Sequence, residues 1–212
     1  MSFREKILLV LLFCIVFLAI VFICAKNQKL IQVRQEYLIN KNELQIKVDD
    51  LKQIRLMEIQ SEKSEVDNFN IIDKNNTIKD FVEVIDDDVL IFRIFENTCL
   101  SCIEENLSAL DTLVKTKPVI ILGNFYNSAA YTFFKEQYNL NNCYMFESNS
   151  KINIPMETNE IMYYFLINKQ MEVYKVHIPI KWDFDFTLTY LSSIDNNDIV
   201  RKYKVIKTPF PA

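Results

Sequence analysis

The N-terminal segment Ile7–Ala25 has 19 consecutive residues without a charge or a proline. As a helix it would be about 28 Å long, which matches the hydrocarbon core of a bilayer. Basic residues flank both ends, so the positive-inside rule hardly favours one orientation. We expect an uncleaved membrane anchor at 7–25 after a short tail, 1–6, with the remainder outside the cytoplasm. A cleaved signal and a lipoprotein signal are alternatives, although Ile23 is a poor residue before a cleavage site or an acylated Cys24.

Residues 26–70 contain no glycine or proline and many charged and amide side chains. Apolar residues recur there at intervals of seven: Leu30, Tyr37, Leu44 and Leu51. This spacing predicts a helix, which can continue the anchor. Because Asn40 and Lys47 interrupt the second apolar position, we expect a solvated helical stalk or linker, with a dimeric coiled coil as the alternative. Ser64–Asn76 is polar and is expected to be a hinge.

Residues 71–212 alternate between segments typical of strands and segments typical of helices. The predicted strands are 89–95, 118–122 and 142–146, the predicted helices are 102–115, 128–138 and 184–194, and 161–167 with 171–177 form a predicted hairpin. We expect Gly123 to end the second strand. The order favours an α/β fold, a mixed sheet flanked by helices, in one domain.

Two cysteines, Cys99 and Cys102, lie where the predicted strand 89–95 ends and a predicted helix begins. The N-terminus of a helix carries partial positive charge and free N–H groups, which stabilise a thiolate. Cys99 is therefore the candidate nucleophile: its thiolate would attack a disulfide, and Cys102 would resolve the mixed disulfide. A static disulfide without exchange activity is the alternative.

This pattern resembles the thioredoxin superfamily, in particular the membrane-anchored thioredoxin-like proteins of bacterial envelopes. The resemblance covers residues 78–200 and is carried by the strand 89–95, the C-x-x-C, the helix after it and the hairpin. It implies an inner-membrane thiol–disulfide oxidoreductase that acts on cysteine pairs of envelope proteins. It also implies a redox partner protein and no cofactor. A binding module of the same fold with little or no catalytic activity is the alternative.

The chain departs from the pattern of this superfamily at three positions. Arg93 stands where a buried acid is expected, and Thr98 stands in place of a tryptophan. Met162 stands where a cis-proline would face the disulfide. Because a nearby cation favours a thiolate, Arg93 is a candidate for tuning Cys102. The substitution at Met162 puts substrate docking in question.

Other charged residues near the motif have simpler explanations. Arg93 can instead be an ion-paired residue, with Glu96 or one of Asp86–Asp88 as its partner. The three aspartates are expected to form a solvated loop. Glu104 and Glu105 are expected in the first turn of the helix, where carboxylates favour the helix dipole. A proton-shuttle role for these two glutamates at the buried thiol is the alternative, with Glu105 as the candidate tuning residue.

The composition argues against several other classes of function. One C-x-x-C supplies at most two zinc ligands, so no metal site is expected. His177, the only histidine, could complete a copper site like that of the copper-delivery branch of the superfamily, but that branch spaces its cysteines by three residues; we expect a surface residue. Cys143 is expected to be a buried core thiol. Gly123 is the only glycine, which argues against glycine-rich phosphate loops, and no basic stripe indicates nucleic acid.

Overall fold

The computed structural model describes residues 3–73, 75–114, 117–146 and 152–195, with residues 4–12, 14, 15, 19 and 195 described by their backbone only. The chain divides into two compact units, Met1–Gln53 and Ile54–Ala212. The first unit is helical, and the second contains all of the strands found in the described residues.

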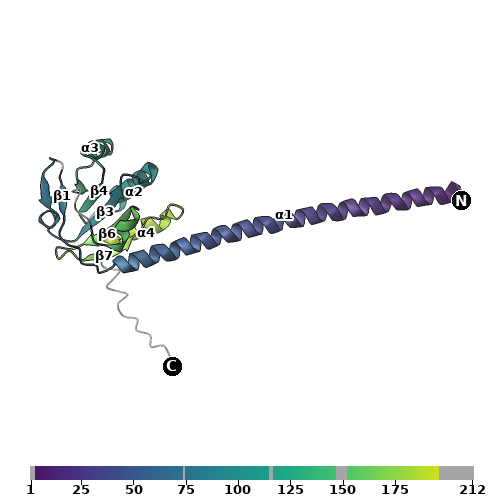
Figure 1. Ribbon diagram of the computed structural model, residues 1–212, viewed down its shortest axis with the longest axis horizontal. Helices are drawn as coiled ribbons and strands as arrows, with labels where there is room; N and C mark the ends of the chain where they lie inside the picture. The colour runs from purple at the N-terminus through teal and green to yellow at the C-terminus, as the bar shows by residue number, and fades with distance from the viewer. Residues whose placement is uncertain (1–2, 74, 115–116, 147–151, 196–212) are drawn as a thin grey trace, which may run out of the picture. The chain divides into compact units, whose positions relative to one another are not determined.

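Helix α1 runs without interruption from Phe3 to Ser61 (Figure 1). The absence of glycine and proline explains this continuity, and the predicted continuous helix is confirmed. The part from Val16 to Ser61 includes a stretch of mean hydropathy 1.5, and it is the one helix among the described residues that is long and apolar enough to cross a membrane. A signal sequence near the N-terminus meets the same criteria, so the anchor stays a prediction.

The second unit is built on a mixed sheet in the order β2-β1-β5-β4-β3-β6-β7. The strands are β1 Asn70–Ile72, β2 Ile78–Asp80, β3 Val89–Phe95, β4 Val119–Asn124, β5 Cys143–Phe146, β6 Tyr163–Ile167 and β7 Val173–His177. Strand β3 pairs in parallel with β4 and antiparallel with β6, and β5 is parallel to β4. All residues of β3 are buried, as the continuous apolar run predicts.

Helices cover both faces of this sheet. Helices α2 Leu100–Leu113, α3 Ser128–Gln137 and α4 Phe184–Asp195 supply side chains to the apolar cluster on one face. The 3-10 helices η1 Phe81–Glu83 and η2 Pro155–Asn159 and the end of α1 supply the cluster on the other face. A parallel β3–α2–β4 unit followed by the antiparallel hairpin β6–β7 and helix α4 is a thioredoxin-like fold, so the predicted fold class is confirmed (Figure 1).

Two local predictions were wrong. The segment Ser64–Asn76 is not a hinge, because it contains β1 and inserts Phe69 and Ile71 into the core. Gly123 lies inside β4 and does not end it, since pairing with β3 continues to Asn124. An added Cβ at Gly123 would lie 1.9 Å from the ring of Phe125, so a larger residue there would require this ring to move.

The buried face of α3 does not include all of its apolar residues. The apolar residues Ala129 and Phe133 are exposed, whereas Tyr131 and Phe134 are buried. The helix begins at an N-cap, Asn127, whose side-chain oxygen accepts a hydrogen bond from the N–H of Ala130. This cap sets where the first turn starts and so which side chains face the sheet.

The last turns of α1 cover the edge strand β7. The carboxylate of Glu58 accepts a hydrogen bond of 2.9 Å from the N–H of Ile178, just after the strand. The carboxylate of Glu62 accepts one of 2.8 Å from the N–H of Val176. An uncovered edge would leave these donors free to pair with another chain, so the two glutamates close this side of the sheet.

Candidate functional site

The cysteine pair lies at the carboxyl end of β3, where a tight turn leads into α2. The N–H of Thr98 donates to the carbonyl of Phe95 at 2.9 Å, and its hydroxyl accepts from the N–H of Phe95 at 3.2 Å. Cys99 is the N-cap of α2, and its carbonyl accepts from the N–H of Ile103 at 3.1 Å. Helix α2 starts at Leu100, two residues earlier than predicted, so Cys102 lies in its first turn.

The two thiols differ in exposure and in acidity. Both are free; Cys99 is exposed and Cys102 is half-buried. A hydrogen bond from the Cys102 thiol, then one from the Ser101 hydroxyl and one from the Cys102 N–H, lower the pKa of Cys99 to about 7. The same bond to Cys99, together with burial, raises the pKa of Cys102. Cys99 therefore ionises first, as a nucleophile paired with a resolving thiol should.

Lys181 is a site residue that the sequence analysis missed. Its charge lowers the pKa of both cysteines, as the smallest of the lowering effects on Cys99. Lys181 is exposed and follows β7, and β7 ends beside the start of β6, where Tyr164 pairs with His177. The sequence did contain a signal for Lys181: it is a basic residue just after the predicted hairpin. It therefore lies at the end of the sheet where Met162 was expected.

Asn106 was also missed. It is buried on α2, and its amide nitrogen donates to the carbonyl of Cys102 at 2.7 Å. Its amide oxygen accepts from the hydroxyl of the buried Tyr164 at 2.7 Å. These two bonds fix the first turn of α2 to the start of β6. A polar residue four positions after Cys102 on a buried helix face was the signal.

Met162 lies where the hairpin register placed it, directly before β6. Its side chain is half-buried and packs against the apolar cluster on the α2 face of the sheet. Its effect on substrate docking stays a prediction.

Arg93 is buried, and its partner is neither Glu96 nor any of Asp86–Asp88, so that expected pairing was wrong. It forms an ion pair with Glu157 of η2, including a hydrogen bond of 3.2 Å from Nε, and it donates to the carbonyl of Leu122 at 3.3 Å. Because side chains alternate along β3, Arg93 lies on the face opposite α2. The two faces of β3 follow this alternation: Ile91 and Phe95 in one cluster, Leu90, Phe92 and Ile94 in the other. A tuning role of Arg93 would thus have to act across the sheet.

The two glutamates of α2 lie beyond its first turn, because the helix starts earlier than predicted; the expected helix-dipole position was wrong. Both are exposed. Glu105 borders a shallow hollow between α2 and α4 together with Ser108 and Leu188. A proton-shuttle role of Glu105 stays a prediction.

His177 is buried, and the expectation of a surface residue was wrong, since the end of α1 covers this strand. Its Nδ1 lies 3.4 Å from Glu58 Oε1, and its Nε2 lies 3.0 Å from the hydroxyl of Thr187. Among the described residues, no three or more histidine, cysteine, aspartate or glutamate side chains are grouped as metal ligands. Cys143 is a buried core residue, as predicted, and burial raises its pKa to about 12.

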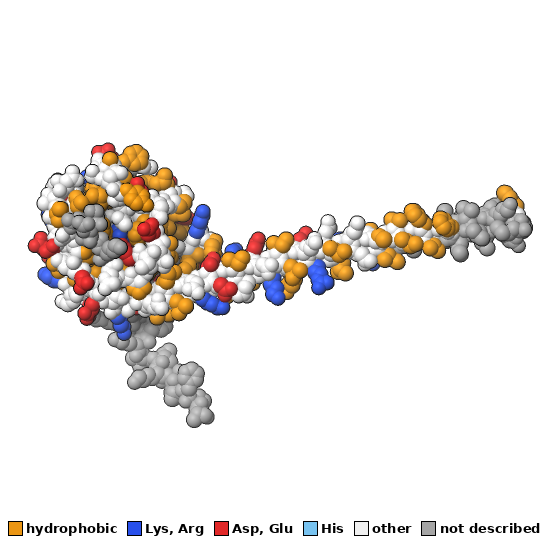
Figure 2. All heavy atoms as spheres, viewed as in Figure 1, with side chains coloured by type: hydrophobic (Ala, Val, Ile, Leu, Met, Phe, Trp, Pro, Cys, Tyr) orange, Lys and Arg blue, Asp and Glu red, His pale blue; other side chains and the backbone are white. Residues whose placement is uncertain are grey.

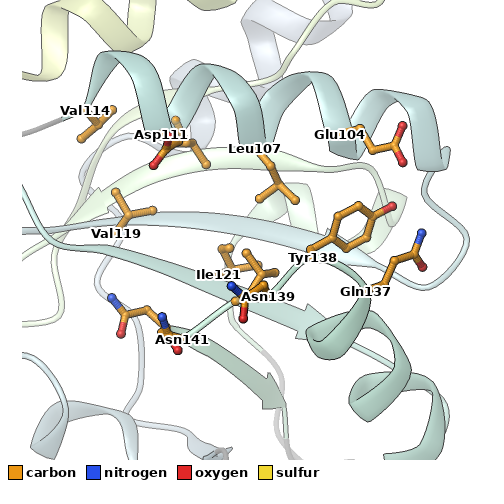
Figure 3. A pocket seen from close by; sticks show the side chains of 13 residues that line it. Glu104, Leu107, Asp111, Val114, Val119, Ile121, Gln137, Tyr138, Asn139 and Asn141 are labelled. Carbon is orange, nitrogen blue, oxygen red and sulfur yellow. The ribbon is translucent and has the colours of Figure 1, made fainter.

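A separate groove of about 650 Å³ lies between α2 and the connection from α3 to β5 (Figure 3). Leu107 and Ile121 form an apolar part of its wall, and Glu104 and Asp111 lie along α2 beside it. Neither cysteine of the C-x-x-C borders this groove.

No family model matches the chain, and no curated protein matches it. Among solved structures, it is similar to BsSco, a member of the Sco family of cytochrome c oxidase assembly proteins (14% identity, 62% of this chain, 93% of that chain, TM-score 0.45). It is similar to a thiol:disulfide interchange protein from Bacteroides sp. (14% identity, 67% and 89%, TM-score 0.43). It is also similar to the thioredoxin domain of a thiol-disulfide oxidoreductase from Bacteroides vulgatus (13% identity, 61% and 97%, TM-score 0.42).

The strand order of the second unit defines a thioredoxin-like fold, and the C-x-x-C lies at the start of the helix after β3.

Proposed function

We propose that this chain is a thiol–disulfide oxidoreductase that acts on cysteine pairs of other proteins. The observation that supports it is the asymmetry of the pair: an exposed Cys99 with a lowered pKa, and a half-buried Cys102 with a raised one. This arrangement supplies a thiolate near neutral pH and a second thiol within hydrogen-bonding reach to complete the exchange.

The exchange begins when the Cys99 thiolate attacks one sulfur of a substrate disulfide. One S–S bond forms, the substrate S–S bond breaks, and the second substrate sulfur leaves as a thiolate that takes up a proton. Cys102 then loses its proton and attacks Cys99, which releases the reduced substrate and leaves a Cys99–Cys102 disulfide. A redox partner protein with a dithiol returns the two electrons. The reverse sequence oxidises a substrate dithiol, and no other cofactor is needed.

The proposed setting is the cell envelope. In this proposal residues 7–25 anchor the chain in the inner membrane, residues 26–70 form a stalk or linker, and residues 71–212 form the catalytic domain on the extracytoplasmic side. The apolar N-terminal part of α1 supports the anchor. Cysteine pairs that cycle between dithiol and disulfide are useful in that oxidising compartment, which supports the side.

The second candidate is a binding module that kept the fold and exchanges disulfides poorly. Met162 favours it, because a methionine replaces the cis-proline expected beside the cysteines. In this alternative Cys99 and Cys102 form a stable disulfide that no partner reduces.

The experiment uses the full chain in detergent, a protein substrate with scrambled disulfides, and a glutathione redox buffer. We expect native disulfides to return at a rate that Cys99→Ser abolishes and Cys143→Ala, at a core cysteine, retains. Cys102→Ser should accumulate a mixed disulfide between Cys99 and the substrate. A Cys99–Cys102 disulfide that forms fully without any turnover would overturn the proposal in favour of the binding module.

A further inference from the structure

The part of α1 between the apolar N-terminal segment and the second unit exposes many apolar side chains. All side chains of residues 26–50 are exposed. Tyr37, Leu44 and Ile46 have 66%, 64% and 62% of their surface open to solvent. Figure 2 shows hydrophobic side chains interspersed with charged ones along this part of the helix. Leaving so much apolar surface in water is unfavourable, and it calls for a partner.

One narrow stripe contains five of these apolar residues and the half-buried Leu51 just beyond them. They follow one another at steps of three or four residues, with a single polar residue, Asn40, among them: Leu30, Val33, Tyr37, Leu44, Val48 and Leu51. After Leu44 the step is four residues, to Val48, so Lys47 does not interrupt the stripe. On a helix of 3.6 residues per turn these positions lie along one side, as in the seam of a coiled coil.

The two flanks of this stripe carry different charges. Helical geometry places Arg34, Lys41 and Lys52 on one flank and Glu36 and Glu43 on the other. Lys29 and Lys47 are the exceptions on the acidic flank. When two such helices pair in parallel, the basic flank of one faces the acidic flank of the other, whereas antiparallel pairing brings like flanks together.

We propose that residues 30–51 are the interface with a second copy of this chain, which packs against them as a parallel two-stranded coiled coil. The seam positions bury the apolar stripe of each copy against the other. The flanks bring Glu36 of one copy near Lys41 of the other. Asn40 pairs with its own counterpart and fixes the register, which is the best-attested use of a single polar seam residue. This interface does not depend on the chemistry of the cysteines.

The first experiment measures the mass of the full chain in detergent micelles by sedimentation. We expect a dimer. Leu44→Glu should raise the dissociation constant of this dimer by about tenfold or more, because a charge would be buried in the seam. Ile46→Glu is the matched control: the same substitution at an equally exposed residue on the same helix, outside the stripe. A monomeric wild-type chain, or equal effects of the two substitutions, would overturn the interface.

The second experiment tests the direction of pairing. Lys41→Glu should weaken the dimer, and Glu36→Lys combined with Lys41→Glu should restore it, because in a parallel pair the two exchanged charges face each other across the interface. Failure of the double variant to recover while Lys41→Glu alone weakens the dimer would overturn the parallel arrangement.

Discussion

At the scale of single residues, the chemistry of the site depends on the hydrogen bonds around one sulfur. Cys99 receives hydrogen bonds from the Cys102 thiol, the Ser101 hydroxyl and a backbone N–H, and each favours its thiolate. Cys102 donates one of these bonds and is partly buried, and both facts keep it protonated. The two cysteines are chemically identical, but they lie about one helical turn apart and differ in burial. This difference gives them separate roles.

Alkylation of Cys99 as a function of pH tests this explanation. We expect the rate to reach half of its maximum near pH 7, because the thiolate is the reactive form. Ser101→Ala removes a donor and should raise the midpoint; Lys181→Ala removes a positive charge and should raise it by less. Lys169→Ala, which removes the same charge in the turn of the hairpin, is the matched control. A midpoint that stays constant in both site variants would contradict the assignment.

At the scale of elements, two carboxylates attach helical segments to the sheet: Glu58, which is buried, and Glu157, which is largely buried. Glu157 attaches η2 to β3 through Arg93, and it also accepts a hydrogen bond of 2.7 Å from the hydroxyl of Tyr163. Glu58 attaches the end of α1 to the end of β7. Each carboxylate meets several donors, so its desolvation is compensated, and removing one partner leaves a buried charge.

Arg93→Met should destabilise the second unit by about 3 kcal/mol or more, because it leaves Glu157 without its cation. The double variant with Glu157→Gln should recover part of this loss, since no charge is then left unpaired. The free energy of unfolding in urea measures both. Lys79→Met, which breaks a more exposed pair with Asp73, is the control and should cost less. A loss in the double variant as large as in Arg93→Met alone would argue against a paired role.

The reduction potential of the same Arg93→Met variant tests the tuning role predicted for this residue. An unchanged potential of the Cys99–Cys102 pair would restrict Arg93 to the attachment of η2.

Glu58 should make the stability of the second unit depend on pH. Burial raises its pKa, but the hydrogen bonds from His177 and the Ile178 N–H and the charge of Arg55 outweigh burial and lower the pKa below 4.5. A carboxyl with a lowered pKa stabilises the fold fully above its unfolded value, and this contribution is lost as pH falls through the folded value. The difference in stability between the wild-type chain and Glu58→Gln should therefore shrink below pH 4.5. An undiminished difference at lower pH would contradict this.

At the scale of the whole molecule, features that follow from local sequence patterns were predicted better than features that depend on long-range contacts. The buried strand 89–95, the helix after Cys99 and the hairpin around Asn168 each carry their own periodicity or turn, and they were predicted correctly. The partner of Arg93 lies 64 residues away in η2, which no local pattern indicates. The strands β1 and β2 have three residues each, too few to show alternation.

The burial of His177 was missed for the same reason. It follows from the end of α1 folding onto β7, and Glu58 and His177 are far apart in sequence. Within the site, the cysteines were predicted from the sequence because the strand, turn and helix that position them are consecutive in the chain. Asn106 was missed because its role depends on the buried Tyr164, which is 58 residues away in the sequence, and Lys181 was missed because sheet pairing brings it to the cysteines.

The coverage of β7 by α1 predicts where the folded unit must begin. A fragment of residues 54–212 keeps Glu58 and Glu62 on the edge strand and keeps Ile54 and Met57 against the core. A fragment of residues 64–212 loses all four, and two hydrogen bonds to charged groups alone contribute about 3 kcal/mol. We therefore expect the longer fragment to be more stable by at least that amount in urea, and the shorter one to aggregate through its open edge. Equal stability and solubility would instead support a domain that starts at the predicted boundary, residue 71.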